Sequence, residues 1–141
     1  MNRMIFVNLP VTDLQKSIAF YEAIGGTADQ HFRDENTQMM RISDEICVML
    51  LTHERFQGFT PRRIPNAHET AQVLLCLSAG SRDEVDAMTL KAGASGGEAD
   101  PNPKQDHGFM YGRSFADPDG HIWELAWMDM AAAMGGAEAA A

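Results

Sequence analysis

Hydrophobic residues follow a helical spacing in two stretches of the chain and a strand-like pattern in the stretches around them. A short apolar run at 3–9 is typical of a strand. Apolar residues then repeat at spacings of four and three over 14–21, which predicts a helix that begins after a capping residue, Thr12. Three more strand-like runs follow, at about 28–33, 38–42 and 46–52.

The same order of elements is repeated after a segment with no clean period, residues 53–71. A strand at 72–77 precedes a second helix, which Ser81 is predicted to cap. Two strands at 109–116 and 121–127 complete the pattern. The repeat indicates that one β-α-β-β-β unit has been duplicated.

This duplication predicts an α+β protein with one domain, residues 1–127, made of two βαβββ modules. Module 1 spans about 3–52, module 2 spans about 72–127, residues 53–71 link them, and an Ala-rich tail follows at 128–141. One module has a single helix and an apolar sheet face, too little to close a core. Two modules that pair as a half-open barrel would leave a concave face for a small molecule.

Composition narrows the classes of partner. The chain has 141 residues and a net charge of -9, and its few basic residues are scattered, which disfavours nucleic acid or an anionic membrane surface. No apolar run reaches the length of a membrane span, so we expect a cytoplasmic protein. Cys47 and Cys76 lie in apolar runs and are predicted to be small core residues.

Asp117-Pro-Asp-Gly120 has the composition of a tight turn between two strands. In the strand that follows, alternation places Ile122, Glu124 and Ala126 on one face. Glu124 is thus a carboxylate within an apolar strand. It is a ligand, a catalytic base, half of an ion pair, or a residue on an open sheet face.

Two segments carry a resemblance to a known family: Val11-Thr-Asp-Leu-Gln-Lys-Ser-Ile-Ala-Phe-Tyr21 and Asp117-Pro-Asp-Gly-His-Ile-Trp-Glu124. With the duplicated pattern, they resemble the vicinal oxygen chelate superfamily, which includes glyoxalase I, bleomycin and fosfomycin resistance proteins and extradiol dioxygenases. The chain looks most similar to the group of predicted lactoylglutathione lyases. The resemblance implies a homodimer whose cavities combine the first module of one chain with the second module of another.

The resemblance also assigns four metal-ligand positions, and only Glu124 matches one. The other three fall on Phe6, on or beside Leu50, and on or beside Leu74, whose side chains offer no donor atom. We therefore expect no metal and no other cofactor. A divalent metal held by a site rebuilt from other residues is the alternative. Three of the five histidines are predicted to lie on the surface: His31, His53 and His68.

Other polar residues can line the cavity without a metal. Asn8 shares a strand face with Phe6, and His107 lies in a loop that enters a strand. Tyr111 and Arg113 share a face of the strand next to Glu124, so an Arg113–Glu124 ion pair is geometrically possible. Glu124 is either a partner in that pair or a group that contacts the ligand, and both roles are compatible.

Two functions remain open from the sequence. One is a metal-free protein that binds a small organic molecule, as the resemblance to bleomycin resistance proteins implies. The other is a glyoxalase-type enzyme, a lyase or isomerase, or a dioxygenase, in which Glu124 acts on a small oxygenated substrate. The missing ligand positions favour the first.

Overall fold

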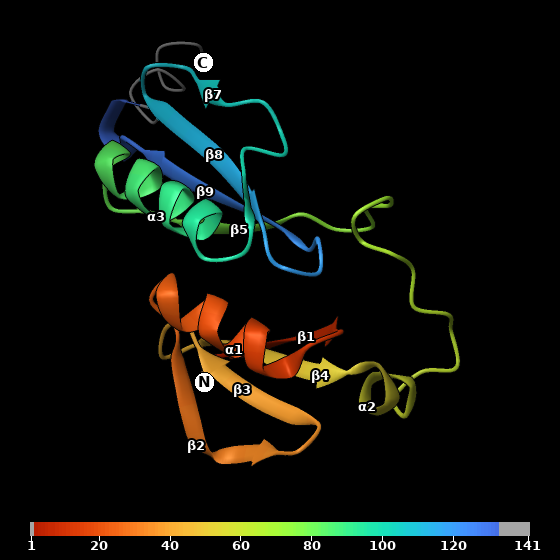
Figure 1. The fold of residues 1–141 in the computed structure, drawn as a ribbon. Helices are drawn as coiled ribbons and strands as arrows, with labels where there is room; N and C mark the ends of the chain where they lie inside the picture. The colour runs from red at the N-terminus through yellow and green to blue at the C-terminus, as the bar shows by residue number, and fades with distance from the viewer. Residues whose placement is uncertain (1, 133–141) are drawn as a thin grey trace.

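Two β-sheets, each covered on one face by a single helix, form the part of the chain that the computed structural model describes, residues 2–132 (Figure 1). The sheet of module 1 has the strand order β1-β4-β3-β2, with β1 parallel to β4. Its elements are β1 (Ile5–Val11), α1 (Leu14–Ala23), β2 (Thr27–Asp34), β3 (Thr37–Arg41) and β4 (Ile46–Thr52).

Module 2 repeats this arrangement with the order β5-β9-β8-β6 and a short extra strand, β7, beside β8. Its elements are β5 (Leu75–Ser78), α3 (Arg82–Ala94), β6 (Glu98–Ala99), β7 (Gln105–Asp106), β8 (Met110–Ala116) and β9 (Ile122–Met128). The predicted linker contains one short helix, α2 (His53–Gln57). None of the helices within residues 2–132 has the length and apolar character needed to span a membrane.

The predicted α+β fold with two modules is confirmed, and the two mixed sheets do not join into a closed barrel. The predicted cap of the first helix was wrong. Asp13, not Thr12, accepts a backbone N–H from the first turn, while Thr12 contacts the other module. Ser81 caps α3 as predicted. Residues 133–141, most of the predicted tail, lie outside the described part of the chain.

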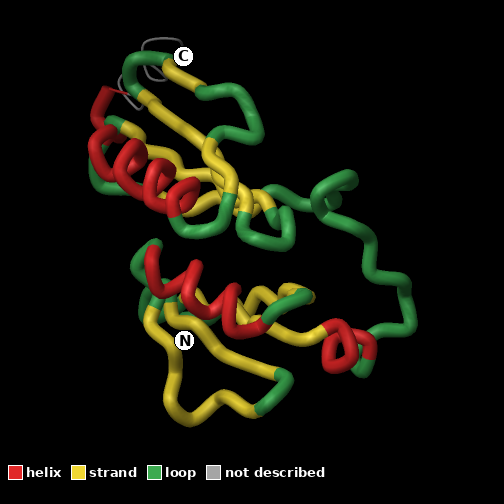
Figure 2. Tube along the Cα trace, in the orientation of Figure 1, coloured by secondary structure: helices red, strands yellow, loops and turns green. Residues whose placement is uncertain are grey.

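The helices α1 and α3 lie between the two sheets, so the sheets share one core (Figure 2). Aromatic side chains from both modules meet there. The rings of Phe20 and Phe115 are 6.0 Å apart, and those of Tyr21 and Trp123 are 6.2 Å apart. All four side chains are almost completely buried. The second face of each sheet therefore points outward, on opposite sides of the molecule.

A buried hydrogen-bond network fixes this arrangement. The Tyr21 hydroxyl donates to Asp117 Oδ2 at 2.7 Å and accepts from Trp123 Nε1 at 3.0 Å. The other Asp117 oxygen accepts the backbone N–H groups of Asp119 and His121. Burial is the main reason that the pKa of Asp117 is raised, and burial together with the Asp117 charge raises the pKa of Tyr21 well above its usual value.

The predicted Asp117–Gly120 turn is thus a clamp between the modules. Asp119 Oδ1 accepts both the N–H and the hydroxyl of Thr12, at 2.9 and 2.8 Å. Gly120 has a φ of +91°, and a Cβ there would lie 2.7 Å from the backbone nitrogen of His68 in the linker. Only glycine suits this position, because the backbone is left-handed and the linker packs directly against it.

Candidate functional site

We call the sheet face that no helix covers the open face of a module. In module 1, strand alternation and the pairing of β1, β4 and β3 place Phe6, Asn8, Met39, Arg41 and Met49 on this face, together with the fully covered Cys47 between Phe6 and Arg41. Most of their sequence neighbours, such as Leu9, Met40 and Val48, point the other way, into the core. Phe6 and Asn8 therefore lie together on a free face, as predicted.

A hollow of about 500 Å³ lies on this open face. It is lined by Met4, Phe6, Phe32, Met39, Arg41 and Met49. Phe6 is 50% exposed and Phe32 is 60% exposed, which is unusual for side chains of this size. Arg41 is the one charged side chain among the six, so the hollow is apolar apart from a single guanidinium group.

A neighbouring carboxylate holds Arg41 in place. Arg41 Nε donates to Asp29 Oδ2 at 3.1 Å. Asp29 Oδ1 accepts the backbone N–H groups of His31 and Phe32, at 2.7 and 2.9 Å. These backbone hydrogen bonds, followed by the Arg41 interaction, lower the pKa of Asp29. Within residues 2–132, the two terminal nitrogens of Arg41 have no hydrogen-bond partner.

The open face of module 2 is also largely apolar. It carries Leu74, just before β5, with Cys76, Ser78, Glu124, Ala126 and Met128. Cys76 lies directly opposite Glu124 in the parallel pair of β5 and β9. The prediction of Cys76 as a core residue was wrong, because it is exposed. Partial burial of the Cys76 thiol, followed by the charge of Glu124, raises the pKa of Cys76.

The predicted Arg113–Glu124 ion pair does not form. In the β8–β9 ladder Glu124 is opposite Ser114, whereas Arg113 points to the helix-covered side. There Arg113 is 8% exposed and binds Asp86 at 2.9 Å and Asp100 at 2.6 Å. Glu124 has no hydrogen bond or ion pair with any residue that the structure describes.

Two more predicted cavity residues face α1 or α3 instead. Tyr111 donates its hydroxyl proton to Asp86 in α3, and Leu50 is fully buried in the core. Met49, next to Leu50, occupies the open face. The predictions failed because alternation gives two equivalent faces per strand and does not say which one the helix covers.

His107 is exposed, as expected for a loop residue. It follows β7, whose Asp106 is held by two hydrogen bonds from Arg82 of α3. The same Arg82 also donates to the carbonyl of Gly108. The loop is therefore anchored to α3. Within the described residues, His107 makes no hydrogen bond or ion pair with Glu124 and does not line the hollow.

One chain does not bring the remaining predicted residues together. Phe6 and Asn8 lie on the open face of module 1, while Leu74 and Glu124 lie on that of module 2. The core and both helices separate the two faces. A pocket that uses all four residues thus requires a second copy of the chain.

The residues at the four expected ligand positions do not fit a divalent metal. Glu124 has oxygen donors, but Phe6, Leu74 and the two candidates of β4, Leu50 and Met49, have no oxygen or nitrogen in their side chains. In the stretch 2–132, no group of three or more His, Cys, Asp or Glu side chains is arranged to hold a metal ion. We therefore assign no chemical step to a metal.

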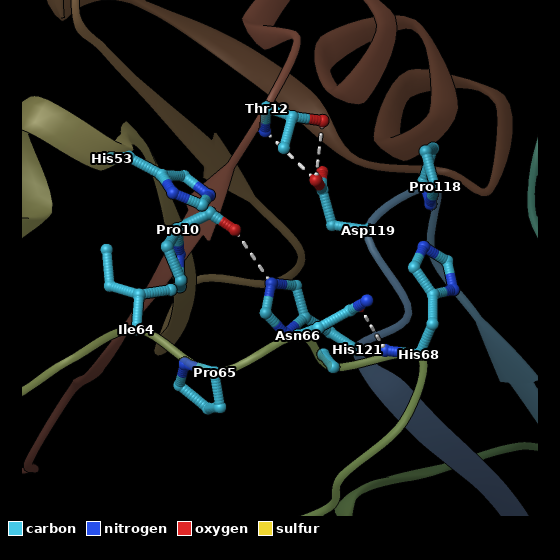
Figure 3. A pocket seen from close by; sticks show the side chains of 11 residues that line it. Pro10, Thr12, His53, Ile64, Pro65, Asn66, His68, Pro118, Asp119 and His121 are labelled. Atoms are coloured by element: carbon cyan, nitrogen blue, oxygen red, sulfur yellow. Dashed lines mark hydrogen bonds between the residues drawn. The ribbon is translucent and has the colours of Figure 1, made fainter.

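A second hollow, of about 350 Å³, lies where the linker crosses the junction of the modules (Figure 3). Its lining residues are Pro10, Thr12, His53, Ile64, Pro65, Asn66, Ala67, His68, Pro118, Asp119 and His121. Asp119 is bound to Thr12, and His121 Nε2 lies 2.8 Å from the Pro10 carbonyl oxygen. These polar groups are already used to join the modules.

His53 and His68 are exposed here and His31 is exposed on β2, as predicted.

Comparison with known proteins gives one family and many similar folds. Residues 3–125 match the model of the Glyoxalase/Bleomycin resistance protein/Dioxygenase superfamily. A hypothetical protein from S. aureus has a similar structure, with a TM-score of 0.74 and 28% identity over 90% of this chain and 94% of that one. No curated protein matches the sequence.

Two further structures share the fold at lower identity. A fosfomycin resistance protein from Listeria monocytogenes is 22% identical, with a TM-score of 0.62 over 90% of this chain and 91% of that one. An antibiotic binding protein from a Streptomyces species is 19% identical, with a TM-score of 0.60 over 91% and 97% of the two chains.

Proposed function

The chain belongs to the glyoxalase/bleomycin resistance protein/dioxygenase superfamily, and we propose that it binds a small, largely apolar organic molecule without a metal. In this proposal the pocket is shared by two copies of the chain: the open face of module 1 from one copy and the open face of module 2 from the other. The resulting homodimer would contain two equivalent pockets related by a two-fold axis.

The observation that carries the proposal is the pair of apolar open faces on opposite sides of one chain. Phe6 is 50% exposed on one face and Leu74 is 51% exposed on the other. Large apolar side chains that are exposed together on one face are typical of interfaces and ligand sites. The edge strands β1 and β5 adjoin the two faces, and within residues 2–132 neither has a second strand neighbour, which leaves these edges available for contact with a second copy.

The polar groups of the combined pocket are few. Module 1 offers the Asn8 amide and Arg41, and module 2 offers Cys76, Ser78 and Glu124. Ligand pockets generally combine an apolar wall with a few polar groups that fix orientation. The antibiotic binding protein with the same fold supports a binding role, because it shows that this fold can serve one.

The unpaired carboxylate of Glu124 favours an enzymatic alternative. A general base must be free to take a proton, and Glu124 has no competing ion pair among residues 2–132. In this case the protein would be a glyoxalase-type lyase or isomerase, and Glu124→Gln would abolish turnover while leaving the fold and the dimer unchanged. If the protein only binds its ligand, Glu124→Gln changes affinity alone.

Native mass spectrometry of protein purified without chelators tests the proposal directly. We expect a dimer that retains or accepts an organic molecule and binds no ion on incubation with Ni²⁺, Zn²⁺, Co²⁺ or Mn²⁺. Binding of one metal ion per site, with loss of that ion in Glu124→Gln, would contradict the metal-free proposal. A monomer at micromolar concentration would contradict the shared pocket.

A further inference from the structure

We infer that the hollow of module 1 takes a ligand with an aromatic or other apolar body and one acidic group, and that Arg41 binds the acidic group. This inference rests on the proposed binding function and specifies its ligand class. The acidic group is a carboxylate, sulfonate or phosphonate, since these present two or more oxygens to a guanidinium.

The lining of the hollow selects the apolar body. Two phenylalanines and three methionines surround the space, and none of these side chains donates a hydrogen bond. Flat ring faces and flexible thioethers adapt to aromatic or irregular apolar groups. A ligand that carried polar groups over its whole surface would lose hydration here without compensation.

The geometry of Arg41 selects the acidic group. Its Nε is bound to Asp29, which fixes the plane of the guanidinium, and its terminal nitrogens have no partner among the described residues. Asp29 Oδ1 accepts two backbone N–H groups and Oδ2 accepts Arg41 Nε, and within residues 2–132 Asp29 makes no bond to the terminal nitrogens of Arg41. A neutral ligand would cover part of Arg41 with apolar surface and leave its donors unpaired. An acidic group would satisfy them.

The composition of the chain alone would not predict a preference for an acidic ligand. The chain carries a net charge of -9, which repels anions at long range. Arg41 is half-exposed, with 42% of its side-chain surface accessible, and lies in an apolar setting where a charged hydrogen bond is stronger than in water. Recognition of the anion is therefore local to this hollow.

A pair of fluorescent probes with the same aromatic frame tests the inference. Anilinonaphthalene sulfonate carries a sulfonate, and N-phenylnaphthylamine lacks it. Binding of each is measured by fluorescence titration of the full chain. We expect the sulfonate to bind about tenfold more tightly, the effect of one or two charge-assisted hydrogen bonds at a half-exposed site.

Variants separate the two components of recognition. Arg41→Met keeps the length and apolar stem of the side chain, and should remove the preference for the sulfonate while leaving the affinity for the neutral probe unchanged. Arg41→Lys, which keeps the charge but not the planar fork, should give an intermediate preference. Arg63→Met is the matched control, because it removes the same charge from an exposed position in the linker.

Phe6→Ser tests the hollow itself and should weaken both probes. If both probes bind, Phe6→Ser weakens both, and Arg41→Met leaves their ratio unchanged, the inference about Arg41 is wrong while the binding function stands. If neither probe binds, or Phe6→Ser changes neither affinity, the proposed site is wrong and the inference fails with it. A loss of preference in Arg63→Met equal to that in Arg41→Met would also overturn the inference.

Discussion

The chain has two tyrosines, and both donate a hydroxyl proton to an aspartate, so they form an internal comparison. Tyr21 is fully buried and donates to Asp117, which is 2% exposed. Tyr111 is 9% exposed and donates to Asp86, whose side chain is 44% exposed. If the Tyr21 network locks the modules together, Tyr21→Phe should destabilise the protein far more than Tyr111→Phe.

The magnitude follows from the groups left behind. Phenylalanine at position 21 creates no cavity, but it removes the donor to the buried Asp117 carboxylate and leaves Trp123 Nε1 without an acceptor. A lost charged hydrogen bond and an unpaired buried donor together cost about 3 kcal/mol. Asp86 keeps Arg113 and solvent, so Tyr111→Phe should cost about 0.5–1 kcal/mol.

Urea denaturation at matched protein concentration measures both variants. With a slope of about 2 kcal/mol/M, Tyr21→Phe should lower the midpoint by about 1.5 M without a change of slope. Burial raises the pKa of Asp117, so the penalty should shrink as the pH falls through that pKa, where the carboxyl takes up a proton. Equal destabilisation by the two variants would refute the assignment of Tyr21 as the lock.

Three further predictions concern the turn, an ion pair and the open face. Gly120→Ala should lower the melting temperature much more than Gly108→Ala, since both have positive φ but only Gly120 would meet the linker with its Cβ; similar losses would contradict the close packing. Arg82 lowers the pKa of Asp106 to about 2, so in NMR titrations Arg82→Met should return the pKa of Asp106 toward the ordinary value of an aspartate. The stability that this ion pair contributes should be present above the ordinary pKa of an aspartate and lost as the pH falls toward 2. An unchanged titration of Asp106 in Arg82→Met would show that Arg82 is not the cause. Cys76 should react with a thiol reagent in dilute protein and become protected as protein concentration rises; a reaction rate independent of concentration would argue against an interface on that face.

The periodicity of the chain predicted most elements of the fold, but not the short strands β6 and β7. The helices after Asp13 and Ser81 and the strands around them occur close to the predicted positions, because spacing of apolar residues and capping residues are local signals. The duplication then limited the possible arrangements. These local signals do not indicate which of the two faces of each strand is covered by the helix.

This ambiguity of face explains the errors at the candidate site. Tyr111 and Arg113 alternate along β8 with the residues of the open face. The prediction assigned them to the open face, whereas they lie on the face that the helix covers. The same kind of error selected Leu50 in place of Met49. Arg41 was missed for a related reason: its role depends on Asp29 of the neighbouring strand, a contact between different strands.

The clamp between the modules was missed because its contacts are distant in sequence. Asp117 and Asp119 were interpreted as turn residues, which is correct locally. Their second role, toward Tyr21 and Thr12, links residues about a hundred positions apart. Such contacts have no periodic signature, and the resemblance to a family indicated only that the turn is part of the fold.

The shared pocket is tested most directly by complementation between two inactive variants. Phe6→Asp disrupts the open face of module 1, and Leu74→Asp disrupts that of module 2. Each variant alone should fail to bind the apolar probe. When the two are mixed and allowed to exchange subunits, about half of the dimers contain both chains, and each of these has one intact pocket. We predict that probe binding returns on mixing, whereas a mixture that stays inactive after proven subunit exchange would contradict the pocket built from two chains.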